Sequence, residues 1–194
     1  MVKDGVQPND PEWLKLAWAE VGVRETQGSR STPRVVEYLK TVGHSNDAVA
    51  WCSAFVNWVF AQLGVSGTKS AMARSWQSWG MRLKEPRRGC IVVFWRSSRS
   101  GSLGHVGFYL GRDRGMIRVL GGNQTNAVTS DSLYHPDRVL AYIWPTYAAT
   151  GATGAGIPLH TKKQLQPAMA ALYVAAVAGI LYKVRNENTT TILT

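Results

Sequence analysis

Two stretches of the chain decide the fold: AWCSAFVNWVFAQL at residues 50–63 and, further along, CIVVFW at residues 90–95. The first repeats apolar side chains at helical spacing on one face, and Gly64 after it provides a C-terminal stop. From the second stretch onward the apolar period falls from 3.6 residues to 2, which is typical of strands. The predicted strands are separated by turns rich in Gly, Ser and Asp and comprise residues 90–95, 105–110, 116–120 and 139–144.

Further helices are predicted on the N-terminal side of this boundary. Residues 11–23 combine a Pro and an acidic residue in the first turn with apolar side chains at helical spacing. The same pattern returns at residues 32–43, and a short helical stretch is predicted at residues 71–79. Helices followed by antiparallel strands predict an α+β domain in which the N-terminal helices pack on the sheet.

Composition limits the possible classes of protein. A chain of 194 residues with 45% apolar content suits one ordinary domain with a buried core. Lys and Arg outnumber Asp and Glu by 22 to 12, so the surface should attract anionic polymers such as nucleic acid, an acidic membrane or a bacterial cell envelope. The two cysteines form no C-x-x-C pair, which excludes zinc ribbons and thioredoxin-type motifs, and we expect no metal or cofactor.

The composition changes sharply after residue 147. We expect a folded domain over residues 1–147, a flexible linker over 148–161, a candidate transmembrane helix over 162–185 and a polar tail over 186–194. No charge occurs from Gln164 to Tyr182, and basic residues flank this segment on both sides. An Ala-rich amphipathic helix packed on the domain is the alternative. The first ten residues lack the apolar segment of a usual secretory signal.

Cys52 begins the helix predicted at residues 50–63. Free backbone N–H groups and the positive end of the helix dipole favour a thiolate at this position, which would activate a nucleophile. Cysteine is also one of the most buried residue types, and Cys52 shares a face with Phe55 and Phe60. Taken alone, the residue fits a core role better, so the catalytic hypothesis requires a partner.

His105 and Asn123 are the candidate partners. If GRDRG at residues 111–115 is the turn of a hairpin, His105 faces Gly121 and Asn123 is its diagonal neighbour on the same face. A register shifted by two residues places Asn123 directly opposite His105, whereas an odd register sends it to the far face. A strand-end histidine and a turn asparagine are the plainer interpretation. Together with Cys52, the pair has the composition needed for thiol-based acyl transfer.

The run from Trp13 to Trp144 resembles the CHAP-type branch of the NlpC/P60 papain-like superfamily, which includes compact peptidoglycan hydrolases of bacteria and phages. The resemblance lies in the ordered blocks AWCSAFVNW, SAMARSW, GCIVV, GHVGFYLG and LGGNQ. It implies that Cys52 is the nucleophile, that His105 is the general base and then acid, and that Asn123 orients the imidazole. Many members carry Glu where this chain has Gly121, so a Cys-His-Asn set is expected, with Gln124 as a possible helper.

Other residues near these blocks receive weaker assignments. The backbone N–H groups of Trp51 and Ser53 are candidates for holding an oxyanion. Asp47 either lines the substrate groove or is a solvated turn acid. Three tryptophans either stack on sugars or pack in the core: Trp76, Trp79 and Trp95. Cys90 begins a predicted strand, and we predict that it is a buried apolar residue. A disulfide between Cys90 and Cys52 would exclude the enzyme hypothesis.

The leading hypothesis is a cysteine amidase or endopeptidase that cleaves an amide bond of bacterial peptidoglycan. The resemblance implies a lytic enzyme of a phage, and the candidate transmembrane helix at residues 162–185 leads us to expect that it is tethered to a membrane, at the bacterial cell envelope or in a virion. A catalytically inactive, membrane-associated structural or interaction protein is the alternative. A basic nucleic-acid-binding protein is disfavoured because the positive charges are scattered, so no nucleic-acid partner is expected.

Overall fold

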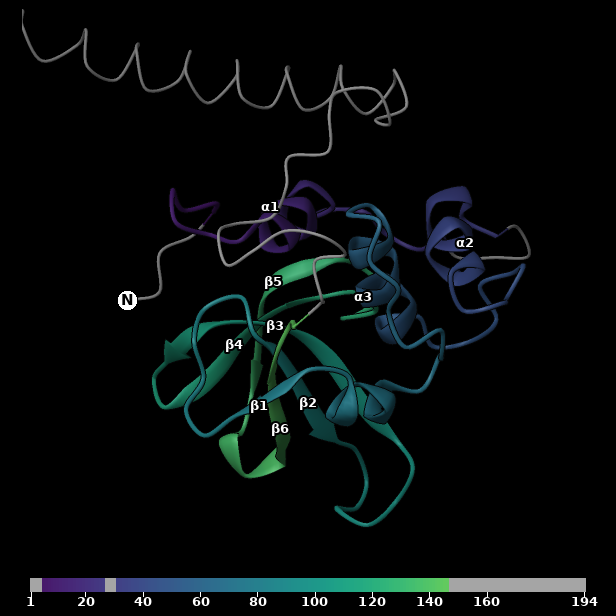
Figure 1. Ribbon diagram of the computed structural model, residues 1–194. Coiled ribbons are helices and arrows are strands. Elements are labelled where there is room, and N and C mark those ends of the chain that lie inside the picture. Colours follow the sequence, from purple (N-terminus) through teal and green to yellow (C-terminus); the bar gives the residue numbers. More distant parts are fainter. Residues whose placement is uncertain (1–4, 27–30, 147–194) are drawn as a thin grey trace, which may run out of the picture. The chain divides into compact units, whose positions relative to one another are not determined.

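The structure is a computed structural model, and it describes residues 5–26 and 31–146 (Figure 1). The predicted linker at 148–161, the candidate transmembrane helix at 162–185 and the tail at 186–194 lie outside the described residues. Among the helices of the described ranges, none combines the length and the apolar character needed to cross a membrane.

Three α-helices lie together on one side of the sheet (Figure 1). Helix α1 spans Glu12–Ala19, α2 spans Pro33–Lys40 and α3 spans Cys52–Ala61. Each is shorter than its sequence prediction, and α1 stops before Gly22, whose φ of +100° cannot continue a helix. Nine of the ten residues of α3 are buried, so this helix is enclosed on all sides.

The strands form one six-stranded sheet in the order β1-β6-β2-β3-β4-β5, and all neighbouring strands are antiparallel. The predicted α+β class is therefore confirmed. The strands are β1 (Met81–Leu83), β2 (Ile91–Trp95), β3 (Gly104–Asp113), β4 (Met116–Gly121), β5 (Thr129–Tyr134) and β6 (Val139–Trp144). Strands β1 and β5 were not predicted from the sequence, because β1 is very short and β5, TSDSLY, is largely polar. The short helical stretch predicted at 71–79 is the 3₁₀ helix η1 (Ala73–Ser78), and a second, η2, spans Pro136–Arg138.

The β3–β4 hairpin differs from the expected one. Its strands pair up to Asp113 and Met116, so the turn consists of Arg114 and Gly115, both with positive φ, and not of residues 111–115. A bulge between Tyr109 and Gly111 then changes the register, and Phe108 pairs with Leu120. This is the even register shifted by two residues. If continued it would bring Asn123 opposite His105, but β4 ends at Gly121.

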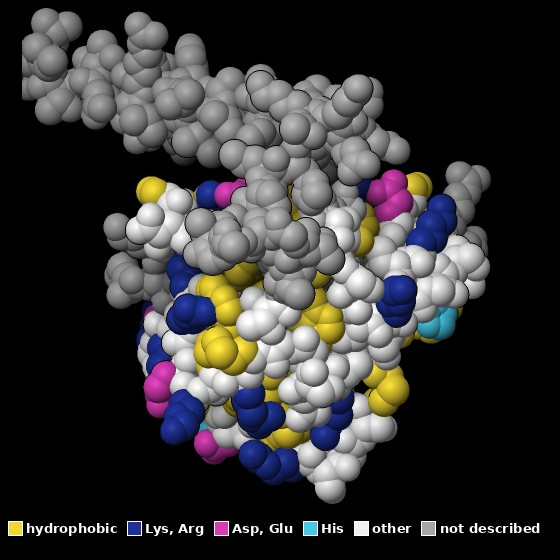
Figure 2. All heavy atoms as spheres, in the orientation of Figure 1, with side chains coloured by type: hydrophobic (Ala, Val, Ile, Leu, Met, Phe, Trp, Pro, Cys, Tyr) yellow, Lys and Arg dark blue, Asp and Glu magenta, His cyan; other side chains and the backbone are white. Residues whose placement is uncertain are grey.

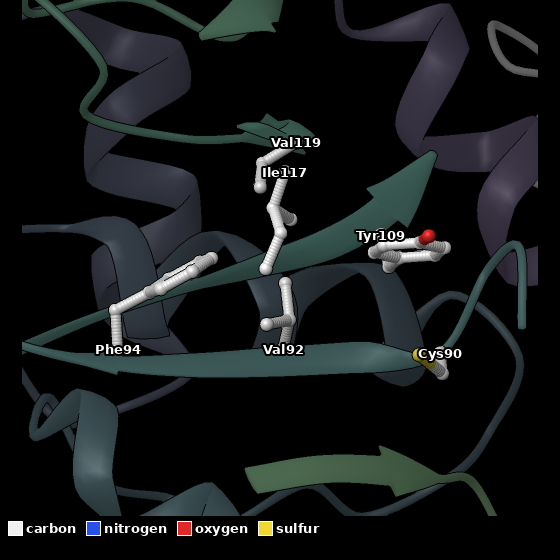
Figure 3. Close-up of a cluster of buried hydrophobic side chains, with 6 residues drawn as sticks. All are labelled: Cys90, Val92, Phe94, Tyr109, Ile117 and Val119. Atoms are coloured by element: carbon white, nitrogen blue, oxygen red, sulfur yellow. The ribbon is translucent and has the colours of Figure 1, made fainter. Parts of the chain in front are cut away.

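The sheet is buried on both faces near its centre. On one face a cluster of side chains from β2, β3 and β4 fills the space between these strands: Cys90, Val92, Phe94, Tyr109, Ile117 and Val119. Figure 3 shows the side chains of β2 pointing toward those of β4, as in a strongly curled sheet. On the other face Phe108 contacts Phe55 and Phe60 of α3. His105 pairs with Phe94 of β2 near one end of β3, and Cys52 lies in the first turn of α3.

Candidate active site

Cys52 is the first residue of α3 and is almost fully buried, with 5% of its surface exposed. No side chain caps the helix, and the first backbone N–H that bonds back into α3 belongs to Phe55. The earlier N–H groups are therefore available near the sulfur. The backbone N–H groups of Ser53 and of Val106 in β3 are close enough to Cys52 to lower the pKa of its thiol, which relates the helix terminus to the strand that carries His105.

Burial raises the pKa of the Cys52 thiol, and this effect outweighs the Val106 and Ser53 N–H groups and the positive charge of Arg96, which lower it. The resting residue is therefore a protonated thiol. This corrects the expectation that the helix terminus alone favours the thiolate. The dipole acts in the expected direction, but enclosure of α3 in the core costs the charged form more.

His105 lies near the start of β3 and is also buried. Desolvation lowers the pKa of its imidazole to about 4, although a hydrogen bond to Gln124 raises it in part. The ring stacks on Tyr134 of β5 at a centroid distance of 5.0 Å, and Tyr134 in turn stacks on Phe94 at 4.5 Å. The imidazole is therefore neutral at pH 7, and its ring plane is fixed by stacking on Tyr134.

The amide partner of His105 is Gln124. Nε2 of His105 lies 3.2 Å from Oε1 of Gln124, and the Tyr134 hydroxyl donates to the same oxygen at 3.1 Å. The amide nitrogen of Gln124 donates to the Thr129 carbonyl at 2.9 Å, to the Thr129 hydroxyl at 3.0 Å and to the Val119 carbonyl at 3.4 Å. These acceptors determine which end of the amide is oxygen.

The orientation of the amide also determines the tautomer of His105. Oε1 of Gln124 is an acceptor only, so Nε2 of the neutral imidazole must carry the proton in their hydrogen bond. The unprotonated nitrogen is then Nδ1, on the other side of the ring. This is the nitrogen that can accept a proton from a nucleophile.

Asn123 does not take the position expected for it. Its side chain makes no hydrogen bond to any residue in the described ranges, and it is half-buried. The ladder ends before it, and a loop with positive φ at Asn123, Thr125 and Asn126 turns the next residue inward. Gln124 is 3% exposed as a result and reaches His105. In the sequence, the signal for Gln124 was its position in the block LGGNQ, directly after Asn123. Because β4 ends at Gly121, Gln124 reaches His105 from the loop with a side chain that is longer than that of Asn123.

Two glycines make this arrangement possible. A Cβ on Gly121 would lie 3.3 Å from the Gln124 side chain and 3.4 Å from His105 Nε2. A Cβ on Gly122 would lie 2.6 Å from the Trp51 ring and 2.7 Å from Phe55. Gly122 therefore lets the loop approach the start of α3. Gly107 of β3 faces β4, where a Cβ would lie 2.5 Å from the Val119 side chain and 2.7 Å from the Leu120 carbonyl oxygen.

Residues 22–26 join the two halves of the site. The Glu25 N–H donates to the Asn126 carbonyl at 2.8 Å, and Arg24 forms an isolated bridge with Ala127. The Glu25 carboxylate accepts the Trp51 indole N–H at 2.9 Å. This segment thus fastens the loop that carries Gln124 to the residue that precedes Cys52.

The remaining candidates make structural contacts. The Trp51 side chain is fully buried, and the Ser53 hydroxyl donates to the Ser70 carbonyl at 2.6 Å and accepts the Trp76 indole N–H at 2.9 Å. Asp47 accepts the Thr32 N–H at 2.8 Å, and this bond is the main cause of its lowered pKa. The side chains of Trp51, Ser53 and Trp76 therefore belong to the core, whereas the backbone N–H of Ser53 faces Cys52.

Trp79 and Trp95 are only partly buried. The Trp79 indole N–H donates to the Ser66 carbonyl at 3.1 Å, and the Trp95 indole N–H donates to the Asp137 carbonyl at 3.1 Å. Both indole N–H groups are thus used within the fold.

Cys52 and Cys90 are both free cysteines, so no disulfide blocks the nucleophile. Burial raises the pKa of the Cys90 thiol to about 12, and the side chain lies in the cluster of Figure 3.

A pocket of about 390 Å³ lies beside the site, lined by Arg24, Glu25, Thr26, Thr125 and Asn126. In the described ranges no cluster of three His, Cys, Asp or Glu side chains is arranged to hold a metal ion.

Residues 44–123 match the CHAP domain family, which confirms the resemblance seen in the sequence. Similar solved structures include the peptidoglycan hydrolase RipB of Mycobacterium tuberculosis, at 20% identity and a TM-score of 0.44, over 68% of this chain and 61% of RipB. The matched part is thus about three fifths of RipB in length. No significant match was found among curated proteins.

Two further structures are similar to this chain. The P60 domain of an antigen from Mycobacterium avium subspecies paratuberculosis is 18% identical with a TM-score of 0.43, over 68% of this chain and 90% of that one. RipD of Mycobacterium tuberculosis, described as a non-catalytic NlpC/p60 domain protein adapted to peptidoglycan binding, is 14% identical with a TM-score of 0.41, over 70% and 95%.

Proposed function

Because residues 44–123 of the chain are a CHAP domain, we propose that the protein is a cysteine hydrolase that cleaves an amide bond of bacterial peptidoglycan. The observation that carries the proposal is the hydrogen bond from His105 Nε2 to Gln124, which leaves Nδ1 of the imidazole as a base next to the strand position that contacts Cys52. An aligned base beside a thiol at a helix start is what nucleophilic acyl transfer requires.

The proximity of the thiol and the imidazole is supported by several contacts. Val106, whose backbone N–H is close enough to Cys52 to lower the pKa of its thiol, directly follows His105. Tyr134 stacks on His105, and its hydroxyl lies close enough to Cys52 for the two to influence each other electrostatically. The charge of Arg96 acts on both Cys52 and His105. The proposed site thus takes residues from α3, β3 and β5.

In the first step Cys52 Sγ attacks the carbonyl carbon of the scissile amide while Nδ1 of His105 accepts the thiol proton. Both groups are neutral at rest because burial disfavours either charge alone. Proton transfer therefore accompanies the attack and produces a tetrahedral oxyanion together with an imidazolium. The free N–H groups at the first turn of α3, including those of Cys52 and Ser53, are suited to stabilise the oxyanion.

In the second half of the reaction the imidazolium returns its proton to the leaving amine, and the C–N bond breaks to give a thioester on Cys52. Water then attacks the thioester, His105 accepts a proton from this water, and the acid product leaves with Cys52 restored as a thiol. Gln124 keeps the proton on Nε2 throughout, so each exchange uses Nδ1. Tyr134 holds the ring plane and the Gln124 oxygen.

The test is hydrolysis of purified peptidoglycan by the full chain, followed by mass spectrometry of the released fragments. Wild-type protein is expected to release fragments with new amine and carboxyl termini, and Cys52→Ala is expected to release none. Cys90→Ala is the matched control, since it removes the other buried cysteine, which directly precedes β2. Release at the wild-type rate by Cys52→Ala would refute the proposal.

A further inference from the structure

Arg96 is an exposed residue whose charge acts on both Cys52 and His105. It follows the last residue of β2, and its N–H donates to the Leu103 carbonyl at 3.1 Å, so it continues the β2–β3 ladder in which Phe94 pairs with His105. Side chains two residues apart on a strand share a face. Arg96 is therefore on the same face as Phe94, one step closer to solvent than the stack of Phe94, Tyr134 and His105.

The cations around Arg96 are already used within the fold. The Arg74 guanidinium donates to three carbonyls of the β2–β3 connection, at 2.9 to 3.0 Å. Arg99 donates to the Asp137 carbonyl, and Arg138 lies over the Trp95 ring. In contrast, the Arg96 guanidinium makes no hydrogen bond or ion pair to any residue in the described ranges.

The charge of Arg96 is close enough to influence the reacting groups. Burial raises the pKa of Cys52 and of Tyr134 and lowers that of His105, and the Arg96 charge lowers all three. The charge of Arg96 therefore acts on both groups that the proposed reaction uses. A guanidinium in such a position is well suited to bind a carboxylate through charge-assisted hydrogen bonds.

From this geometry we propose that Arg96 binds a carboxylate of the peptide stem next to the scissile amide, and thereby makes the enzyme selective for substrates in which this group is free and not amidated. The inference rests on the proposed function. It assigns Arg96 a role in substrate binding, separate from the proton transfers of Cys52 and His105.

The experiment compares two soluble muropeptides that differ only in this group, which is a free carboxylate in one and a primary amide in the other. For the wild-type chain we expect kcat/KM to be about 10- to 100-fold higher for the free acid, mostly through KM. Arg96→Gln should reduce this ratio to within about twofold of one, and Arg96→Lys should retain part of it. Arg114→Gln, in the exposed turn at the opposite end of the β3–β4 hairpin, is the control with an equal charge change and should keep the wild-type ratio.

The ratio of the two kcat/KM values separates substrate binding from a general electrostatic effect on catalysis. If Arg96 acted only through its charge near Cys52, its loss would change kcat/KM by the same factor for both muropeptides. A wild-type ratio near one, or an unchanged ratio in Arg96→Gln, overturns the inference. If wild-type protein cleaves neither substrate, the proposed function fails. In that case, calorimetry measures the binding of both muropeptides to the Cys52→Ala chain and tests the role of Arg96 independently of cleavage. Tighter binding of the free acid supports the inference, and equal binding of the two muropeptides overturns it.

Discussion

The Gln124 amide oxygen and the His105 imidazole are 3.2 Å apart, and this contact supplies the third polar group of the site. The neighbouring Asn123, expected in that role, has no such contact. The amide of Gln124 is itself held by the Thr129 and Val119 carbonyls, so its oxygen has no alternative orientation. A neutral amide in this place fixes the tautomer of the base without adding negative charge to a buried site.

Removal of the Gln124 amide should therefore reduce turnover more than removal of Asn123. We expect Gln124→Ala to lower kcat by about 10²-fold, because the imidazole loses the partner that keeps its proton on Nε2. Asn123→Gly is the control, since glycine accepts the positive φ of that residue, and it should stay within about threefold of wild type. Rates are measured from muropeptide release. Equal losses in the two variants would contradict the assignment of Gln124.

The buried His105 should make stability depend on pH. Its pKa is lowered from 6.5 to about 4, so between these values the unfolded chain binds a proton that the native chain does not. This difference in proton binding adds about 3 kcal/mol to the free energy of unfolding. The full amount is present above pH 6.5 and is lost as the pH falls toward 4. Urea unfolding at pH 7 and at pH 4.5 should show a smaller loss for His105→Gln than for wild type. Parallel losses would show that His105 is not buried as a neutral group.

The two cysteines should differ in reactivity toward iodoacetamide at neutral pH. Cys52 is 5% exposed, and in the proposed mechanism His105 accepts its proton, whereas Cys90 is fully buried. We expect Cys52 to be alkylated first, with loss of activity, and His105→Ala to slow that labelling. Peptide mapping after partial labelling gives the order. Faster modification of Cys90 with full retention of activity would exclude Cys52 as the nucleophile.

The close approach of Gly122 to α3 should make this position intolerant of a side chain. Gly122→Ala places a Cβ within 2.7 Å of Trp51 and Phe55, and we expect a destabilisation of about 1–3 kcal/mol together with reduced activity. Gly64→Ala, where a Cβ meets nothing within 4 Å but φ is +70°, measures the backbone cost alone and should leave activity unchanged. Denaturant unfolding and hydrolysis assays on both variants test this, and wild-type activity in Gly122→Ala would count against it.

The segment after residue 147 should be separable from the hydrolase. The uncharged run from Gln164 to Tyr182 favours a membrane anchor, so a chain ending at Tyr147 is expected to fold, remain soluble and cleave peptidoglycan. The full chain is expected to partition into lipid vesicles. Flotation and circular dichroism of both chains provide the measurement. A truncated chain that unfolds, or a full chain that ignores vesicles, would place the segment in the core of the domain.

The sequence alone, through its local periodicity and residue chemistry, determined the fold class of this protein and the elements that carry Cys52 and His105. The helical face of residues 52–60 and the period-2 segments that follow predicted a helix packed on an antiparallel sheet, because burial of apolar faces depends on spacing within each element. The position of Cys52 at a helix start and of His105 at a strand start followed from the same spacing. The even register of the hairpin was also among the expected alternatives.

Tertiary structure alone decided the partner of His105 and the charge state of Cys52. The bulge after Tyr109 and the early end of β4 at Gly121 are set by packing between strands, and they place Gln124 where the ladder would have placed Asn123. Tyr134 lies on a polar strand that has no periodic signal of its own. The thiol is protonated because enclosure of α3 removes water from Cys52, and desolvation depends on every element that surrounds a group, which no local pattern contains.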